Sequence, residues 1–258
     1  MVIRRLLLRY LALFVVICCS VSCLTGCGAN ELDQDPQHSE ETPAADAETA
    51  ENDSGQAAEI TEEEKIESLY RECAKLTYCI FTSSDSKGTG FLYNGKYVIT
   101  NAHVLYEADD FYLKDIEGNE HKGTVIFKDD SADIAVIRLE EKQNGSVCFG
   151  DSDTVAVGEQ LLMIGNPYNG DPFSFCTGRR LELDEEFRHL IDRREQFIPL
   201  DADIVSGYSG GPAFNMAGEL IGISNAAYIG DLSAYDFDHL SLIIPINRVR
   251  DLIDENCK

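Results

Sequence analysis

The chain has 258 residues, of which 46 are Asp or Glu and only 21 are Lys or Arg, so its formal net charge is -25. Binding to nucleic acid needs clustered Lys and Arg that face phosphates, and the sequence has no such cluster. The composition therefore argues against a role on DNA or RNA. Residues 28–64 carry thirteen Asp or Glu and no Lys or Arg, so about half of the negative excess lies in one segment. The remaining chain of about 195 residues is long enough to bury a sizeable core.

The N-terminal 27 residues have the pattern of a secretory signal. Arg4, Arg5 and Arg9 precede an apolar run, 10–27, that contains no charged residue. The run ends in Leu24-Thr25-Gly26-Cys27, which resembles a bacterial lipobox and implies cleavage before Cys27 and lipidation of that cysteine. The alternative is an uncleaved signal anchor, because about 18 apolar residues approach the minimum length of a membrane span. Both alternatives place the following residues outside the cytoplasm, and the first makes the membrane a partner through a lipid anchor.

Residues 28–60 are predicted to form an acidic, disordered linker. They are rich in Glu, Asp, Ala, Ser, Thr, Gln and Pro, contain no aromatic residue and have almost no large apolar one. Such a segment cannot bury enough apolar surface to offset the entropy lost on ordering it. Its like charges repel one another, so we expect an extended spacer between the membrane and a folded domain at 61–258.

A helix is predicted at each end of this domain. Thr61 and Glu64 form a capping-box pattern, which indicates a helix N-terminus. Apolar residues then share one helical face: Ile66, Leu69, Tyr70 and Cys73. The last stretch, Ile246 to Asn256, is predicted to be a closing helix with Asn247 as its N-cap.

Short strands are predicted between the two helices. Apolar or alternating runs separated by turn residues occur at 77–82, 89–93, 97–100, 109–114, 123–128, 134–139, 155–164, 173–182, 195–200, 212–215, 219–225 and 240–245. The pair Asn94-Gly95 between two of these runs is a strong hairpin signal. Many short strands at this spacing are typical of antiparallel barrels or sandwiches.

The cysteines predict neither a disulfide nor a metal site. Four belong to the signal, and five remain in the domain: Cys73, Cys79, Cys148, Cys176 and Cys257. An export route permits disulfides, but five is an odd number and the spacings match no metal-binding pattern. We therefore interpret most of them as small buried hydrophobic residues.

Three segments contain residue types that carry chemistry. His103 follows an apolar strand, Asp133 opens the strongly apolar run 134–139, and Ser209 lies between glycines in Gly207-Tyr208-Ser209-Gly210-Gly211-Pro212. Glycines beside a serine allow the backbone to approach a substrate carbonyl closely. Each segment alone is more often structural: a packed histidine, a turn aspartate or a loop serine. Together and in this order they form a specific pattern.

This pattern resembles the signature blocks of the trypsin-like serine proteases, and most closely those of the HtrA (Deg) branch. The matching blocks are Gly88-Thr89-Gly90-Phe91, Ile99-Thr100-Asn101-Ala102-His103-Val104, Asp133-Ile134-Ala135-Val136, Gly165-Asn166-Pro167, Leu200-Asp201-Ala202, the Ser209 block, Gly218-Glu219-Leu220-Ile221-Gly222-Ile223 and Ile244-Pro245-Ile246. The resemblance covers about 77–254. It implies an all-β fold of two six-stranded β-barrels with a catalytic triad in the cleft between them.

The resemblance also implies a serine endopeptidase that cleaves extracytoplasmic polypeptides through an acyl-enzyme intermediate, with no cofactor and no metal. Ser209 would be the nucleophile, His103 the general base and acid, and Asp133 the residue that orients the imidazole. The backbone N–H groups of Gly207 and Ser209 would form the oxyanion hole. A strand edge would pair with the substrate backbone, and it contains Ser224, Asn225 and Ala226.

Some positions depart from the family pattern or leave specificity open. Tyr208 stands where zymogen-type trypsins have an aspartate that pairs with a newly cut N-terminus, and where HtrA relatives usually have asparagine. Activation by zymogen cleavage is therefore not expected, and no PDZ domain is expected after the closing helix.

Asp203 would select Lys or Arg if it lies at the base of the specificity pocket, as in trypsins. If Ile204 and Val205 turn inward instead, the pocket would be shallow and apolar and would suit small aliphatic side chains.

Two other interpretations remain. Residues 207–211 also match the G-x-S-x-G elbow of α/β-hydrolases, but that elbow needs a helix after the serine, and Gly211-Pro212 followed by a β-rich run argues against one. The second is a catalytically idle trypsin-fold lipoprotein that serves as a binding or sensing module. All three triad positions are filled, which argues against it.

Overall fold

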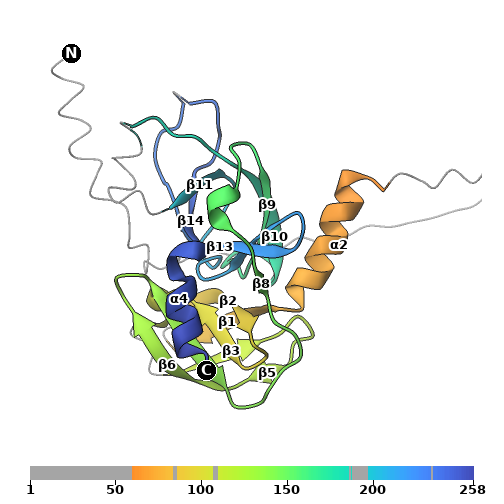
Figure 1. Cartoon of the computed structure of the whole chain (residues 1–258), viewed down its shortest axis with the longest axis vertical. Coiled ribbons are helices and arrows are strands. Elements are labelled where there is room, and N and C mark those ends of the chain that lie inside the picture. Colours follow the sequence, from red (N-terminus) through yellow and green to blue (C-terminus); the bar gives the residue numbers. More distant parts are fainter. Residues whose placement is uncertain (1–59, 84–85, 107–109, 186, 188–196, 234) are drawn as a thin grey trace, which may run out of the picture. The chain divides into compact units, whose positions relative to one another are not determined.

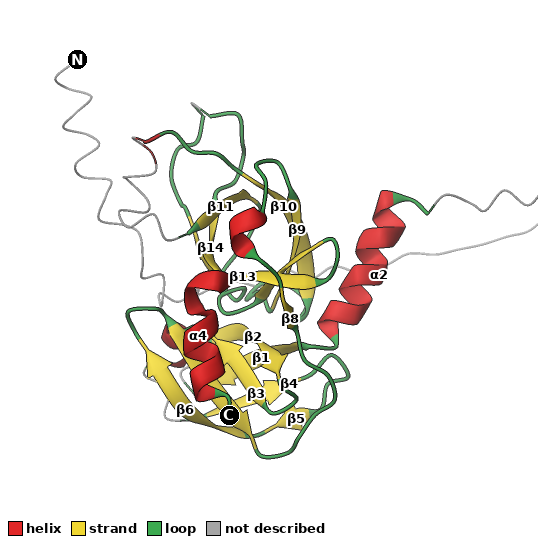
Figure 2. Ribbon diagram, in the orientation of Figure 1, coloured by secondary structure: helices red, strands yellow, loops and turns green. Residues whose placement is uncertain are grey.

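Strands dominate the regular structure of the chain in the computed structural model, which describes residues 60–83, 86–106, 110–185, 187, 197–233 and 235–258 (Figures 1 and 2). The predicted signal, the lipidation site Cys27 and all but the last residue of the predicted linker lie outside these residues. Among the helices that the structure describes, none is both long and apolar enough to cross a bilayer.

The first sheet has the strand order β5-β4-β1-β2-β3-β7-β6, and all its neighbouring strands are antiparallel. Its strands are β1 (Thr77–Thr82), β2 (Lys87–Tyr93), β3 (Tyr97–Thr100), β4 (Phe111–Lys114), β5 (Glu120–His121), β6 (Gly123–Asp129) and β7 (Ile134–Leu139). The predicted hairpin joins β2 to β3. Asn94 and Gly95 both have positive φ there, 51° and 65°, a conformation that Asn-Gly pairs adopt readily.

The second sheet has the order β12-β9-β10-β11-β14-β13-β8, and an additional pairing of β12 with β13 closes six of its strands into a barrel. Its strands are β8 (Cys148–Phe149), β9 (Gln160–Gly165), β10 (Ser174–Arg180), β11 (Ile198–Asp201), β12 (Pro212–Asn215), β13 (Glu219–Ala227) and β14 (Ser241–Pro245). The two-residue strand β8 runs parallel to β13, and the other pairs are antiparallel.

Strand β7 is apolar on both faces because each face is buried in a different core. Ala135, Ile137 and Leu139 belong to the core inside the first sheet, whereas Ile134 and Val136 belong to a core shared with the second sheet. Successive side chains of a strand point to opposite faces, so a strand buried on both sides reads as a continuous apolar run. β9 is divided in the same way between the second sheet and the shared core.

Helices α2 and α4 lie near the two ends of the part of the chain that the structure describes, and both pack against the sheets. Helix α2 (Glu62–Ala74) begins with the predicted capping box, in which Thr61 and Glu64 exchange hydrogen bonds of 2.8 and 3.2 Å. Helix α4 (Ile246–Asn256) has the predicted bounds, but the prediction of Asn247 as its N-cap is wrong, because Pro245 occupies that position. Asn247 lies in the first turn, where its side-chain amide donates a 2.6 Å hydrogen bond to Asp151.

The shared core joins both sheets to both helices. From α4 it includes Ile246, Val249 and Ile253, and from α2 it includes Cys73 and Ala74. The predicted all-β fold of two six-stranded barrels with an N-terminal and a C-terminal helix is confirmed. Each sheet contains in addition one two-residue strand, β5 or β8, that the sequence does not predict.

Candidate active site

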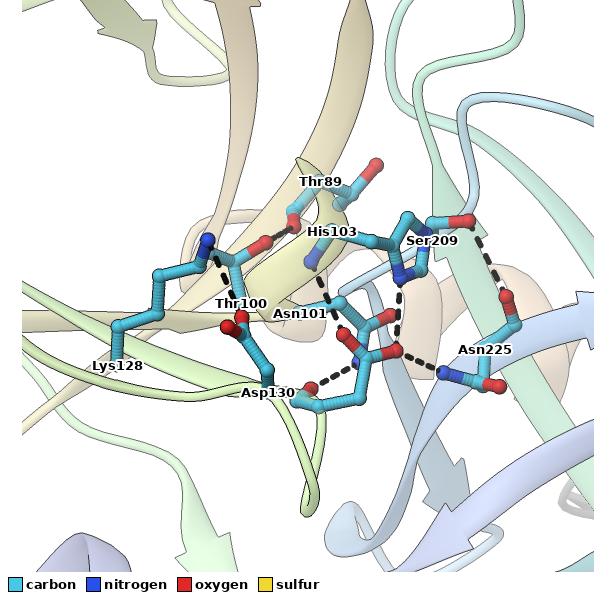
Figure 3. A network of polar contacts seen from close by, with 9 residues as sticks. Thr89, Thr100, Asn101, His103, Lys128, Asp130, Ser209 and Asn225 are labelled. Carbon is cyan, nitrogen blue, oxygen red and sulfur yellow. Dashed lines mark hydrogen bonds and ion pairs between the residues drawn. The ribbon is translucent and has the colours of Figure 1, made fainter. Parts of the chain in front are cut away.

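His103 and Asp133 are held together by two hydrogen bonds. His103 lies in a short 3₁₀-helix, η1 (Ala102–Leu105), that follows directly after β3. Its Nδ1 lies 2.7 Å from Asp133 Oδ2, and its backbone N–H donates to Asp133 Oδ1 at 3.0 Å (Figure 3). The side chains are 47% and 26% exposed, so a substrate can reach the imidazole. A carboxylate at Nδ1 favours the tautomer with its proton on that nitrogen, which leaves Nε2 as an acceptor.

The turn between β6 and β7 places Asp133. Asp133 has a φ of 55°, a left-handed conformation that Asp tolerates better than most residues. Asp129 shapes the turn, because its Oδ1 accepts hydrogen bonds from the Ala132 and Ser131 N–H groups at 3.0 and 2.8 Å. These hydrogen bonds lower the pKa of the Asp129 carboxyl below its usual value, and the bond from the Ala132 N–H contributes most. Asn101 donates to the Asp133 carbonyl at 2.9 Å and ties the turn to the end of β3.

Asn225 connects Asp133 with Ser209. Its side-chain amide donates to Asp133 Oδ2 at 2.6 Å, and its backbone carbonyl accepts a 3.3 Å hydrogen bond from Ser209 Oγ. Figure 3 shows His103 and Asn225 converging on the same carboxylate. The register of β13 against β14 shifts between Ser224 and Ala226, and such a bulge re-aims one side chain. The bulge therefore accounts for the approach of the Asn225 side chain to Asp133.

The loop before Ser209 presents two backbone N–H groups. Gly207 has a φ of 106°, and a Cβ at this position would collide with the Asn166 carbonyl. Only glycine fits both constraints. The Gly207 carbonyl accepts hydrogen bonds from Thr89 Oγ1 at 2.7 Å and from the Asn166 N–H at 3.3 Å. Neither the Gly207 nor the Ser209 N–H donates a hydrogen bond to any group within the described part of the chain, so both remain available to a ligand.

Thr89 in β2 attaches this loop to the first sheet. Its N–H donates to the Ser209 carbonyl at 2.9 Å, in addition to the bond from its hydroxyl to Gly207. Thr100 Oγ1 in turn donates to the Thr89 carbonyl at 2.6 Å (Figure 3). Gly210, with a φ of 82°, fits against Thr100 because it lacks a Cβ. The loop that contains Ser209 is thus attached to β2 and β3 of the first sheet, and β3 ends just before the 3₁₀-helix that carries His103.

The remaining predicted residues lie around this centre. Asp203 is 68% exposed and lies 3.9 Å from His239, whereas Ile204 beside it is only 6% exposed. Ser224 is fully buried, and its backbone exchanges 2.8 Å hydrogen bonds with Gly210 and Gly211 rather than facing solvent. Ala226 is partly buried on β13 and pairs with Leu242 of β14.

Sequence reasoning missed the parts played by three side chains. Thr89 and Asn101 lie in the matched blocks, but nothing in the blocks shows that Thr89 contacts Gly207 or that Asn101 contacts Asp133. Asn225 was expected to pair through its backbone, and its side-chain contact with Asp133 depends on a bulge that the sequence does not reveal. The described residues contain no group of His, Cys, Asp or Glu side chains that could hold a metal ion.

This fold and this arrangement of Ser, His and Asp define a class of protein. The family model described as "Trypsin-like peptidase domain" matches residues 88–223, just over half of the chain. The chain belongs to the family of trypsin-like peptidase domains.

Similar proteins within this class are bacterial HtrA-type proteases. A "Probable periplasmic serine endoprotease DegP-like" of Pseudomonas savastanoi pv. phaseolicola is 34% identical over 174 residues, which cover 67% of this chain and 35% of that protein. A protein of the same description from Buchnera aphidicola subsp. Baizongia pistaciae is 35% identical over 168 residues, covering 64% and 35%. The structure "HtrA-type protease AlgW with tripeptide" has a TM-score of 0.63 and 26% identity, covering 74% of this chain and 62% of that one. The chain thus spans about a third of the length of these curated relatives.

Proposed function

We propose that the protein is a serine endopeptidase in which Ser209, His103 and Asp133 form a catalytic triad. The 2.7 Å contact between His103 Nδ1 and Asp133 Oδ2 carries this proposal. With its proton held on Nδ1, His103 can accept the Ser209 proton at Nε2, and the Asp133 charge stabilises the imidazolium that results. Ser209 Oγ donates to the Asn225 carbonyl in the unliganded chain, so it must rotate toward His103 before attack.

The reaction then proceeds in two stages. Ser209 Oγ attacks the substrate carbonyl carbon, and the oxyanion that forms accepts hydrogen bonds from the Gly207 and Ser209 N–H groups, which have no other acceptor among the described residues. Each such donor is worth roughly 10²–10³ in rate. His103 donates its proton to the departing amine, which leaves an acyl-enzyme on Ser209. Water, deprotonated by His103, releases the acyl group and restores the serine.

The proposed substrates are polypeptides that bind in an extended conformation beside β13, near Asn225 and Ala226. We propose a preference for small aliphatic side chains before the scissile bond. Two observations support this preference: Asp203 is 68% exposed, and its apolar neighbour Ile204 is buried, whereas Val205 is 46% exposed and does not turn inward as expected. A solvated carboxylate attracts a basic side chain only weakly, because water screens the charge. His239, 3.9 Å away, also competes for Asp203 when it is protonated.

The protein is proposed to act outside the cytoplasm as a lipoprotein of the HtrA type. The apolar run 10–27, the lipobox-like end at Cys27 and the acidic segment 28–60 support export, anchoring and a spacer, in that order. The curated relatives are described as periplasmic, which agrees with this location.

Single substitutions in the triad test the activity. Ser209→Ala, His103→Ala and Asp133→Asn should each remove nearly all cleavage of unfolded casein, and their combinations should lose little more, because the three residues act as a unit. Ser206→Ala, an exposed serine in the same loop, is the matched control and should cleave at the parental rate. Parental activity in Ser209→Ala would overturn the assignment.

A catalytically idle binding protein is the second candidate. A serine-reactive fluorophosphonate separates the two, because it bonds only to an activated serine. The proposed enzyme should be labelled at Ser209, and the His103→Ala variant should not. Absence of labelling in a folded parental chain would favour the binding function.

A further inference from the structure

The residue immediately before the proposed nucleophile is buried in the core of the second barrel. Tyr208 is only 4% exposed and packs in the same apolar cluster as Leu161, Met163 and Ile243. Its neighbour Ser209 is partly exposed at the surface of the site. An aromatic side chain in this core fixes the backbone on both of its sides, because close packing leaves the ring few alternative positions.

The ring of Tyr208 lies directly over Gly165, the last residue of β9. A Cβ at position 165 would collide with the first atoms of the ring, so this approach requires glycine. The Tyr208 hydroxyl contacts the thiol of Cys176. Cys176 lies on β10, the strand that pairs with β9 (Figure 1). Burial raises the pKa of Tyr208 and raises that of Cys176 to about 12, so both groups are neutral at physiological pH. Tyr208 is therefore attached to two strands of the second barrel.

The main chain of Tyr208 closes the turn that presents the two free N–H groups. Its N–H donates to the Val205 carbonyl at 3.1 Å, and its carbonyl accepts from the Gly211 N–H at 2.8 Å. Gly207 lies within the turn closed by the first hydrogen bond, and Ser209 lies within the turn closed by the second. A displacement of the Tyr208 Cα would thus reorient both N–H groups.

We propose that Tyr208 is a positioning residue for the oxyanion hole: its buried ring, seated on Gly165, holds the Gly207 and Ser209 N–H groups toward one point. This inference rests on the proposed peptidase function. The packing of the Tyr208 ring on Gly165 holds the loop in place, so the loop needs no ion pair with a newly cut N-terminus.

Three variants test the ring. Tyr208→Leu fills much of the site without a ring and should lower kcat about 10²-fold, the cost of losing one oxyanion donor, with KM changed less than about threefold. Tyr208→Phe keeps the ring and should retain kcat within about tenfold, the range for one neutral hydrogen bond. Gly165→Ala keeps Tyr208 but displaces its ring, and should lower kcat as Tyr208→Leu does. In the double variant, Gly165→Ala should cost no further activity, because the ring it displaces is already absent.

A peptidyl aldehyde inhibitor supplies a readout that a purely structural role would not change. Its hemiacetal oxygen occupies the oxyanion hole, so the affinity for the aldehyde should fall in proportion to kcat/KM across the variants. The measurement is made at a temperature where near-ultraviolet circular dichroism shows every variant to be folded. Folded Tyr208→Leu with parental kcat and aldehyde affinity would overturn the inference. If Tyr208→Leu does not fold, Gly165→Ala decides: a parental kcat overturns it, and a loss restricted to kcat supports it. An inactive parental chain would instead contradict the peptidase function itself.

Discussion

At the scale of single residues, Asn225 serves the proposed site through two different groups. Its side-chain amide reaches the carboxylate that orients His103, and its carbonyl accepts the Ser209 hydroxyl. The motifs predict His103, Asp133 and Ser209 as the triad because they occur together and in this order. They could not predict the Asn225 side-chain contact, because it depends on the register shift in β13.

Replacement of Asn225 should weaken catalysis. Asn225→Ala removes a hydrogen bond to a charged group, which is worth about 1.5–3 kcal/mol, so kcat should fall about tenfold or more. Asn225→Asp has the same shape but places a second carboxylate beside Asp133, and like charges at that distance should lower kcat further at pH 8. The measurement is steady-state hydrolysis of a peptide. Equal rates in the Asp and Ala variants would show that the side chain does not face Asp133 in solution.

Thiol labelling should follow burial. All five described cysteines are free, and burial raises the pKa of Cys73, Cys79 and Cys257 to about 12. Because their pKa is raised above the usual value, these three thiols stay protonated and unreactive up to about pH 11. Cys148, in contrast, is exposed and accessible to a reagent. Iodoacetamide at pH 8 should modify Cys148 in the native chain and all five after denaturation, as read by mass spectrometry. Rapid native labelling of Cys79 would contradict the buried position of β1.

At the scale of elements, the sequence predicted strands from short apolar or alternating runs. Every predicted run overlaps a strand of the structure. The runs of β7 and β9 are nearly all apolar because each of these strands is buried between two cores. The two-residue strands β5 and β8 were missed, because backbone pairing at a sheet edge leaves almost no pattern in side chains. The predicted run 155–164 began too early, because its first residues form a turn that precedes β9.

Helix α4 should contribute strongly to the stability of the whole domain. Ile253 is fully buried in the shared core, so Ile253→Ala should lower the free energy of unfolding by about 2–5 kcal/mol through lost contacts and a cavity. Glu255→Ala, two residues later on the exposed face, is the control and should change stability by less than about 0.5 kcal/mol. Denaturation in urea, followed by circular dichroism, measures both. A similar midpoint for the two variants would contradict the packing of α4.

At the scale of the whole molecule, the proposed lipid anchor depends on one cysteine. Cys27→Ala should abolish metabolic labelling of the protein with a radioactive fatty acid and release it from the membrane fraction. Cys23→Ala, a change of the same kind four residues earlier, should leave both properties intact. Continued labelling of Cys27→Ala would assign the anchor to a different residue.

The contacts between Thr89 and the Ser209 loop also determine the stage of synthesis at which the proposed site can assemble. Thr89 and Gly207 are 118 residues apart, and a chain is synthesised and delivered from its N-terminus. The sheet that carries His103 and Asp133 is complete before the nucleophile has emerged, and the loop around Ser209 acquires its shape only when β9, β10 and β13 are in place. On the proposed function, a chain that has emerged only as far as β7 would contain His103 and Asp133 but no nucleophile, and would have no peptidase activity.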